Sequence, residues 1–295
     1  MAELVYAYVS EAYLARGGSS SLPMPTMVEK IRNWSYEFFV FGLKEAQSCI
    51  FAGSFFFLLF LSKHIPLFGL ARYDFLFIAA VLLQVILYFT KVETWDEVKT
   101  IFVFHIIGFV LETFKTHPAV GSWSYPEDGF FVVGTVPLFA GFMYAAVGSY
   151  ISQAWRIFKL ELVNPPSYAW SAILCAAIYL NFFTNFFILD LRIILIPAVF
   201  LFFAQTSVRF IVTDKVRSMP LALAFCLIAF FIWIAENIST FYGAWQYPDQ
   251  VHVWNVVSTN KITSWFLLVI ISFILVAALK HLKYDILKWK SDKPA

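Results

Sequence analysis

Long apolar segments recur along the whole chain, and they limit the folds that it can adopt. Of the 295 residues, 61% are apolar and 20% aromatic, whereas only 14% are charged, well below the roughly 25% typical of soluble domains. A run of about 20 mostly apolar residues crosses a bilayer as a helix. Strands of a membrane barrel would alternate polar and apolar side chains, but these runs are apolar all round. The pattern therefore predicts an all-α polytopic membrane protein.

The apolar segments predict eight transmembrane helices. Their approximate ranges are 46–62, 75–90, 101–115, 131–151, 169–189, 192–211, 220–241 and 264–281. Several are shorter than the roughly 20 residues that a span needs, so their ends must lie among flanking polar residues.

The residues before the first span predict a cytoplasmic N-terminal segment over 1–43. Glu3–Ala15 is expected to form a short helix, and the Gly/Ser run at 17–21 a flexible linker. From Met27 onward, apolar residues recur at steps of three and four, which predicts an amphipathic helix in the membrane interface. No signal peptide is expected, because the first strong apolar run begins near residue 46.

The distribution of lysine and arginine predicts the orientation. With eight spans and a cytoplasmic N-terminus, 16 of the 21 basic residues face the cytoplasm, as the positive-inside rule requires. The other five are expected on the outer side: Lys63, Arg72, Lys115, Arg192 and Lys261. Both termini are therefore expected in the cytoplasm, with residues 284–295 forming a basic tail.

One short motif occurs twice. The first copy runs from Gly121 to Glu127 and the second from Gly243 to Asp249, and both read G-[SA]-W-x-Y-P-[ED]. Each follows an apolar segment that carries one glutamate near its end. The spacing predicts an internal duplication, with four-helix repeats at 44–165 and 166–283. An even number of spans per repeat makes the two repeats parallel, and the interface between such repeats is a natural place for a site.

The two glutamates that precede the motifs are the candidate catalytic residues. They are Glu112 and Glu236. A charged group within a span costs about 2.5–3.5 kcal/mol on insertion scales and needs a reason. A carboxyl group that burial holds protonated can act as a general acid. The alternative is structural, because both lie within about two turns of a helix end and could reach interfacial water or cap backbone there.

The candidate substrate-binding residues surround these glutamates. Helical spacing places Trp233 and Asn237 on the same face as Glu236, and His105 on the same face as Glu112. The motif loops could fold back over the glutamates, or their aromatic residues could form an ordinary interfacial belt. The full set is Trp123, Tyr125, Trp245, Tyr247, His105, Trp233, Asn237, Asn181 and Asn185.

Several classes of function lack their signals. The five histidines form no paired box, so no metal and no other cofactor is expected. There is no phosphate-binding GxxxxGK[ST] loop. A net charge of +2 is too small to indicate a nucleic-acid partner, and the three cysteines all lie in apolar segments.

Three stretches resemble a known family. They are Lys44–Ser48, Val136–Ala145 and Trp233–Asn237. Together they are similar to a bacterial YoaT-like integral membrane family, a domain of unknown function, over about residues 40–283. The resemblance implies a location in the plasma (inner) membrane and implies no activity.

A second resemblance concerns the layout of one region. A helix with a glutamate, then Gly-x-Trp-x-Tyr, then Val136-Pro137 is similar in arrangement to membrane carotenoid hydratases and small-subunit lycopene cyclases. That resemblance implies carboxyl groups that protonate a polyene double bond without a redox metal. The chain lacks the Pro-x-Glu-Glu run of that cyclase type.

Three functions are compatible with these observations. The first is an intramembrane acid–base enzyme for an apolar, isoprenoid-like or lipid substrate, with Glu236 and Glu112 as acid and charge stabiliser. The second is a transporter or exporter of a small hydrophobic molecule, and the third a non-catalytic membrane partner protein. The expected partners are the lipid bilayer and an apolar small molecule, and the sequence leaves the oligomeric state open.

Overall fold

The computed structural model describes residues 27–291 of the chain. The predicted helix at Glu3–Ala15, the linker at 17–21 and the last four residues of the basic tail lie outside this range. The described residues divide into two units, 27–39 and 40–291. Helix α2 (Met27–Ser48) begins in the first unit, where Met27, Ile31 and Trp34 are exposed. The helix predicted from Met27 is thus confirmed, while its position in a membrane interface stays a prediction.

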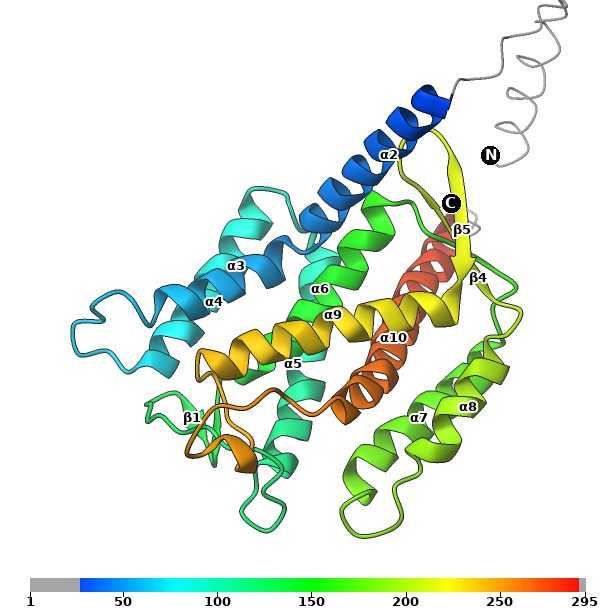
Figure 1. Cartoon of the computed structure of the whole chain (residues 1–295). Coiled ribbons are helices and arrows are strands. Elements are labelled where there is room, and N and C mark those ends of the chain that lie inside the picture. Colours follow the sequence, from blue (N-terminus) through cyan, green and yellow to red (C-terminus); the bar gives the residue numbers. More distant parts are fainter. Residues whose placement is uncertain (1–26, 292–295) are drawn as a thin grey trace, which may run out of the picture. The chain divides into compact units, whose positions relative to one another are not determined.

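The second unit is mostly helical (Figure 1). Its helices are α3 (Ile50–Leu61), α4 (Arg72–Phe89), α5 (Trp95–Lys115), α6 (Ala140–Ile157), α7 (Tyr168–Thr184), α8 (Arg192–Phe202), α9 (Leu221–Phe241), α10 (Asn260–Ser291) and the short 3-10 helix η1 (Pro248–Gln250). Each predicted span thus overlaps an α-helix, and the first, 46–62, also includes the end of α2. Two of these helices are far too short to cross alone: α3, with 12 residues, and α8, with 11, are only about 18 and 17 Å long at 1.5 Å per residue.

Among the described residues, three helices are long and apolar enough to span a membrane. They are Arg72–Phe89, Leu221–Phe241 and Asn260–Lys280. A fourth span results if the bent pair formed by α2 and α3 counts as one. Helix α5 falls short because it carries charged residues near both ends: Asp96, Glu97, Lys99, Glu112 and Lys115. The chain is therefore a mostly helical protein with three or four candidate membrane spans among the described residues.

The prediction of an all-α fold is wrong in two places, where short strands replace the ends of predicted helices. The predicted span 131–151 begins with a hairpin of β1 (Val132–Val133) and β2 (Val136–Pro137), and helix begins only at Ala140. Gly134 has a φ of +63°, and Pro137 has no N–H to donate within a helix. Residues 131–139 thus favour a turn.

The second exception is the end of the predicted span 192–211. Helix α8 ends at Phe202, and β4 (Ser207–Ile211) pairs antiparallel with β3 (Glu161–Val163) and β5 (Val216–Pro220) in the order β3-β4-β5. Val208, Phe210 and Ile211 are β-branched or aromatic residues, which favour strands. Arg209, placed in a helix by the sequence prediction, lies opposite Glu161 in this sheet.

The core of the second unit is built by both predicted repeats. One cluster of buried side chains joins Phe104 of α5 and Ile151 of α6 to residues of α7–α10. The other cluster joins residues of α3–α6 to Trp245 and Tyr247 of the second motif. Each predicted repeat thus supplies part of the core around the other.

Helices α5 and α6 approach closely through glycines. A methyl group at Gly108 would meet the Tyr144 ring and its Cβ, and one at Gly148 would meet the Phe104 ring. Small residues at helix contacts let backbones approach in membrane proteins. By contrast, a methyl group at Gly53 on α3 would meet nothing within 4 Å.

Gly108→Ala is expected to destabilise the protein by about 1–3 kcal/mol, because the added methyl group overpacks the α5–α6 contact. Gly53→Ala makes the same chemical change at an open helical site and is expected to stabilise by up to about 1 kcal/mol. Thermal unfolding of the purified protein in a mild detergent measures both. Equal melting temperatures for the two variants would contradict this account of the contact.

Candidate functional site

The first motif loop folds back onto Glu112. The Trp123 indole Nε1 donates to Glu112 Oε2 at 2.8 Å, and the Tyr125 hydroxyl donates to the same oxygen at 2.7 Å. The Tyr144 hydroxyl, from α6, donates to Oε1 at 2.8 Å. Glu112 is buried near the end of α5. Three donors therefore hold its carboxyl group in one position.

The second motif loop folds back onto Glu236 in a similar way. The Tyr247 hydroxyl donates to Glu236 Oε1 at 2.5 Å, and Trp265 Nε1 of α10 donates to Oε2 at 2.8 Å. The motif tryptophan, Trp245, is buried in the core and does not reach the carboxyl group. In both motifs the tyrosine thus donates to the glutamate that precedes the motif. The tryptophan donor comes from the motif loop at Glu112 and from α10 at Glu236.

The motif tyrosines remain hydrogen-bond donors over a wide pH range. Burial raises the pKa of Tyr125 well above its usual value, and the charge of Glu112 raises it further. Burial and the charge of Glu236 raise the pKa of Tyr247 in the same way. Both phenols therefore stay protonated and keep donating to their glutamates.

The two motif loops are joined directly by a β-bridge between Ser124 and Gln246. The Ser124 N–H donates to the Gln246 carbonyl, and the Gln246 N–H donates to the Ser124 carbonyl, each at 2.9 Å. Both residues occupy the variable position between Trp and Tyr. Gly121 and Gly243 open the motifs with φ of +57° and +65°, values that favour glycine. The motifs thus adopt similar turns and pair at equivalent positions.

Arg72, the first residue of α4, links the two loops a second time. Its Nη1 donates to Glu127 Oε1 at 2.8 Å and to the Gly243 carbonyl at 3.0 Å, and its Nη2 donates to the Tyr242 carbonyl at 2.8 Å. The side chain is only 7% exposed. Lys63 adds a half-exposed ion pair to Glu127 at 2.9 Å. Arg72 therefore holds the acidic end of the first motif against the start of the second.

A cavity of about 350 Å³ lies beside the paired loops, between the ends of α5, α7, α9 and α10. Its lining residues are Leu111, Lys115, Ser122, Trp123, Tyr144, Phe182, Asn185, Phe186, Asp190, Arg192, Glu236, Tyr247, Ser258, Asn260, Lys261, Ser264, Trp265 and Leu268. Four predicted site residues are among them: Glu236, Trp123, Tyr247 and Asn185. Glu112 is not, so the two candidate carboxyl groups differ in their access to this space.

The other predicted site residues hold the surrounding segments in place. The Asn237 side chain accepts from the Val257 N–H at 2.9 Å, and Trp233 Nε1 donates to the Val257 carbonyl at 3.0 Å. Asn181 accepts from the Leu191 N–H at 2.9 Å and so fixes the α7–α8 connection. His105 lies beside Phe142 in the α5–α6 contact, with its Nδ1 buried and without a hydrogen-bond partner.

Three basic residues line the cavity, and the sequence identified none of them as binding residues. They are Lys115, Arg192 and Lys261. Lys115 Nζ donates to Asn185 Oδ1 at 2.9 Å, and Arg192 pairs with Asp190. Lys261 Nζ lies 4.2 Å from the centre of the Tyr247 ring. The only available signal was that all three belong to the five basic residues expected on the outer side.

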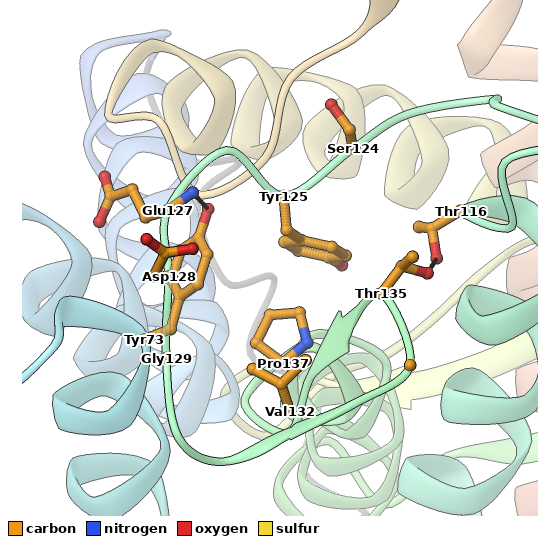
Figure 2. Close-up of a pocket in the computed structure, with 11 residues that line it drawn as sticks. Tyr73, Thr116, Ser124, Tyr125, Glu127, Asp128, Gly129, Val132, Thr135 and Pro137 are labelled. Atoms are coloured by element: carbon orange, nitrogen blue, oxygen red, sulfur yellow. Dashed lines mark hydrogen bonds between the residues drawn. The ribbon is translucent and has the colours of Figure 1, made fainter.

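A second, smaller cavity of about 290 Å³ lies on the other side of the first motif loop (Figure 2). Figure 2 shows the Tyr125 ring pointing into it, with Thr116 and Thr135 hydrogen-bonded to each other at 2.7 Å and the Glu127 N–H directed at the Tyr73 hydroxyl. Its lining contains no lysine or arginine. The residues that line this cavity support the first motif loop.

A metal site would need several ligands in one place. Across residues 27–291, no group of three or more His, Cys, Asp or Glu side chains is placed to hold a metal ion. The larger cavity offers carboxyl, phenol, indole and amine groups.

Comparison with known proteins gives a family without an assigned activity. The family described as "Protein of unknown function (DUF817)" matches residues 37–273. The "Uncharacterized protein YoaT" of Bacillus subtilis (strain 168) is 51% identical over 243 residues, which are 82% of this chain and 91% of YoaT. A chain from a crystal structure of a cross-linked MvINS trimer gives a TM-score of 0.44 at 15% identity, over 63% of this chain and 95% of that one, a likeness too distant to establish a common fold. The resemblance predicted from the sequence is confirmed, and the chain belongs to the DUF817 family.

Proposed function

We propose that this protein is an intramembrane acid–base enzyme for an apolar, isoprenoid-like or lipid substrate, and that Glu236 is its acid. One observation carries the proposal: a buried glutamate, held by a tyrosine and a tryptophan, lies in the wall of a cavity that also has apolar walls. Leu111, Phe182 and Leu268 provide such walls. A buried carboxyl group that is held in one position is suited to proton transfer.

The donors around Glu236 fit both of its protonation states. A protonated carboxyl group can give its proton to a double bond or to a leaving oxygen. The carboxylate that remains is stabilised by the Tyr247 hydroxyl and the Trp265 N–H, which point at it before the reaction begins. Lys261, whose charge acts on Glu236, favours that carboxylate further.

Glu112 has a different role in this proposal. Trp123, Tyr125 and Tyr144 all donate to its carboxyl group, and it does not line the larger cavity. Glu112 therefore positions Trp123 in the cavity wall and holds the first loop in register with the second.

We further propose eight spans arranged as two parallel repeats, 44–165 and 166–283, in the plasma membrane with cytoplasmic termini, in which the short helices α3 and α8 cross only together with their flanking residues. The reciprocal Ser124–Gln246 bridge supports the repeats, because it joins the same position of the two motifs, as a two-fold axis between the repeats would require. The five basic residues expected on the outer side support the orientation, because all of them lie near the two motif loops.

The test is mass spectrometry of total lipid and isoprenoid extracts, with retention times, because an isomerisation leaves the mass unchanged. The cells compared lack the protein, overproduce it, or make Glu236→Gln. We expect a species that follows the wild type and falls by about 100-fold or more with Glu236→Gln, as removal of a general acid predicts.

Glu161→Gln is the matched control, since Glu161 is an exposed glutamate on β3 at the far end of α6. It should leave the extract unchanged. Identical extracts from wild type and Glu236→Gln would overturn the proposal and direct attention to transport or to a partner subunit.

A further inference from the structure

We infer that the larger cavity binds the phosphate head group of a membrane amphiphile, with Lys115 and Lys261 as its ligands. This inference rests on the proposed function and names the class of its substrate: an isoprenoid-like or acyl chain that ends in a phosphate. The argument concerns charge balance, because buried cations need partners.

Lys115 has only a neutral partner among the described residues. Its side chain is buried at the end of α5, and its ammonium group donates to the Asn185 side-chain oxygen at 2.9 Å. No carboxylate of residues 27–291 lies within 4.0 Å of it. An ammonium group has three N–H donors, so Lys115 can still donate into the cavity.

Lys261 is in a similar position. Its Nζ lies over the Tyr247 ring at 4.2 Å and over the Trp123 ring at 5.5 Å, and it too makes no ion pair within the described part of the chain. The two aromatic faces attract the cation but leave its N–H groups free to donate. They fix the ammonium group in the wall of the cavity.

The third basic residue, Arg192, already has its counter-ion. It pairs with Asp190, and its Nη1 donates to Ser264 Oγ at 2.8 Å. The charges of Arg192 and Lys261 both act on Lys115, so the three cations are close enough to repel one another. The cavity lining holds these three basic residues against two carboxyl groups, those of Asp190 and Glu236, and therefore carries an excess of positive charge that an anion would relieve.

The form of the cavity favours a phosphate on a chain over a single carboxylate. Two lysines match a group that carries close to two negative charges at neutral pH. Helix α10 begins at Asn260 in the cavity wall, which places the positive end of its dipole there as well. Leu111, Phe182 and Leu268 line the remainder and can contact the first carbons of a chain.

The experiment is equilibrium binding of tritiated farnesyl phosphate to the purified full-length protein in a neutral detergent. Unlabelled farnesol, dodecyl phosphate and inorganic phosphate serve as competitors. We expect dodecyl phosphate to compete well, and farnesol to compete at least about tenfold more weakly because it lacks the charge. Equal competition by farnesol would overturn the head-group inference. Equally strong competition by inorganic phosphate would overturn the amphiphile in favour of free phosphate.

The variants test the two lysines. Lys115→Gln and Lys261→Gln are each expected to weaken binding by roughly tenfold or more, and Lys115→Arg and Lys261→Arg to restore much of it, which excludes simple misfolding. Lys99→Gln is the matched control, because Lys99 is exposed and paired with Asp96. Unchanged binding in both glutamine variants would overturn the inference.

Glu236→Gln separates this inference from the proposed function. In the Glu236→Gln background, Lys115→Gln and Lys261→Gln should still weaken the binding of farnesyl phosphate by roughly tenfold or more. If binding depends on the two lysines but Glu236→Gln leaves the extracts unaltered, the proposed enzymatic function is refuted and the phosphate site is supported. If a product depends on Glu236 but binding does not depend on the two lysines, the phosphate site is refuted and the proposed enzymatic function is supported.

Discussion

Arg72→Met is expected to lower the free energy of unfolding by about 3–5 kcal/mol, because it removes all the hydrogen bonds that a largely buried guanidinium group makes to both loops. The change leaves Glu127 with only the half-exposed Lys63, and it leaves the Tyr242 and Gly243 carbonyls without a donor. Arg72→Lys should restore only part of the loss, because an ammonium group cannot reproduce the planar fork of donors that reaches both loops.

Thermal unfolding in detergent measures this effect. At about 2–4 °C per kcal/mol for a protein of this size, Arg72→Met should melt roughly 10 °C or more below the wild type. Arg209→Met is the matched control, since Arg209 is 50% exposed and lies 3.9 Å from its partner Glu161. Exposed pairs contribute about 1 kcal/mol at most. Equal shifts for the two variants would rule out the proposed linking role of Arg72.

Cysteines at positions 124 and 246 are expected to form a disulfide in nearly every molecule. Directly opposed residues that exchange both hydrogen bonds have Cα atoms about 5.5 Å apart, within the 4.4–6.8 Å that a disulfide spans. The double variant Ser124→Cys/Gln246→Cys would be made after Cys49, Cys175 and Cys226 are replaced by alanine. Oxidation should then join the two motif loops covalently.

A protease site inserted after Pro165, in the exposed turn before α7, makes the link visible on a gel. After cleavage, the two halves should stay together until a reductant is added. The control pair is Lys159→Cys/Gln246→Cys: Lys159 is exposed and lies beyond the far end of α6, and a helix of that length measures about 27 Å. Separation of the halves in the 124/246 variant would refute the paired arrangement of the motifs.

Periodicity and hydropathy predicted most of the helices, because a long apolar run by itself indicates a helix that is buried in protein or lipid. They failed where local chemistry decides the structure. Residues 131–139 are apolar enough to be read as the beginning of the span 131–151, yet Gly134 and Pro137 favour a turn. Residues 207–211 continue the hydropathy of α8, but they form the central strand between the neighbouring β5 and the sequence-distant β3. Their β-branched and aromatic residues favour a strand, but the pairing with β3 cannot be read from residues 207–211 alone.

The candidate site was predicted in its carboxyl groups but not in its cations. Glu112 and Glu236 were recognisable because a glutamate in an apolar run is costly, and the motif spacing indicated loops that return to them. Lys115 and Lys261 are ordinary residues at helix ends in the sequence, and only the fold brings them to one cavity. Tyr144, the third donor to Glu112, could not be predicted either, because a tyrosine in an apolar helix is common and does not indicate its partner.

The contacts of Arg72 have a consequence for the synthesis of the chain. Its two carbonyl partners follow it by 170 and 171 residues, which a ribosome takes roughly 10–30 s to add at 5–20 residues per second. During that interval Glu127, only 55 residues downstream, is the available counter-ion. The ion pair with Glu127 would therefore hold the Arg72 side chain until the second motif is made. A chain truncated after the first motif would keep this ion pair and lack both carbonyl acceptors.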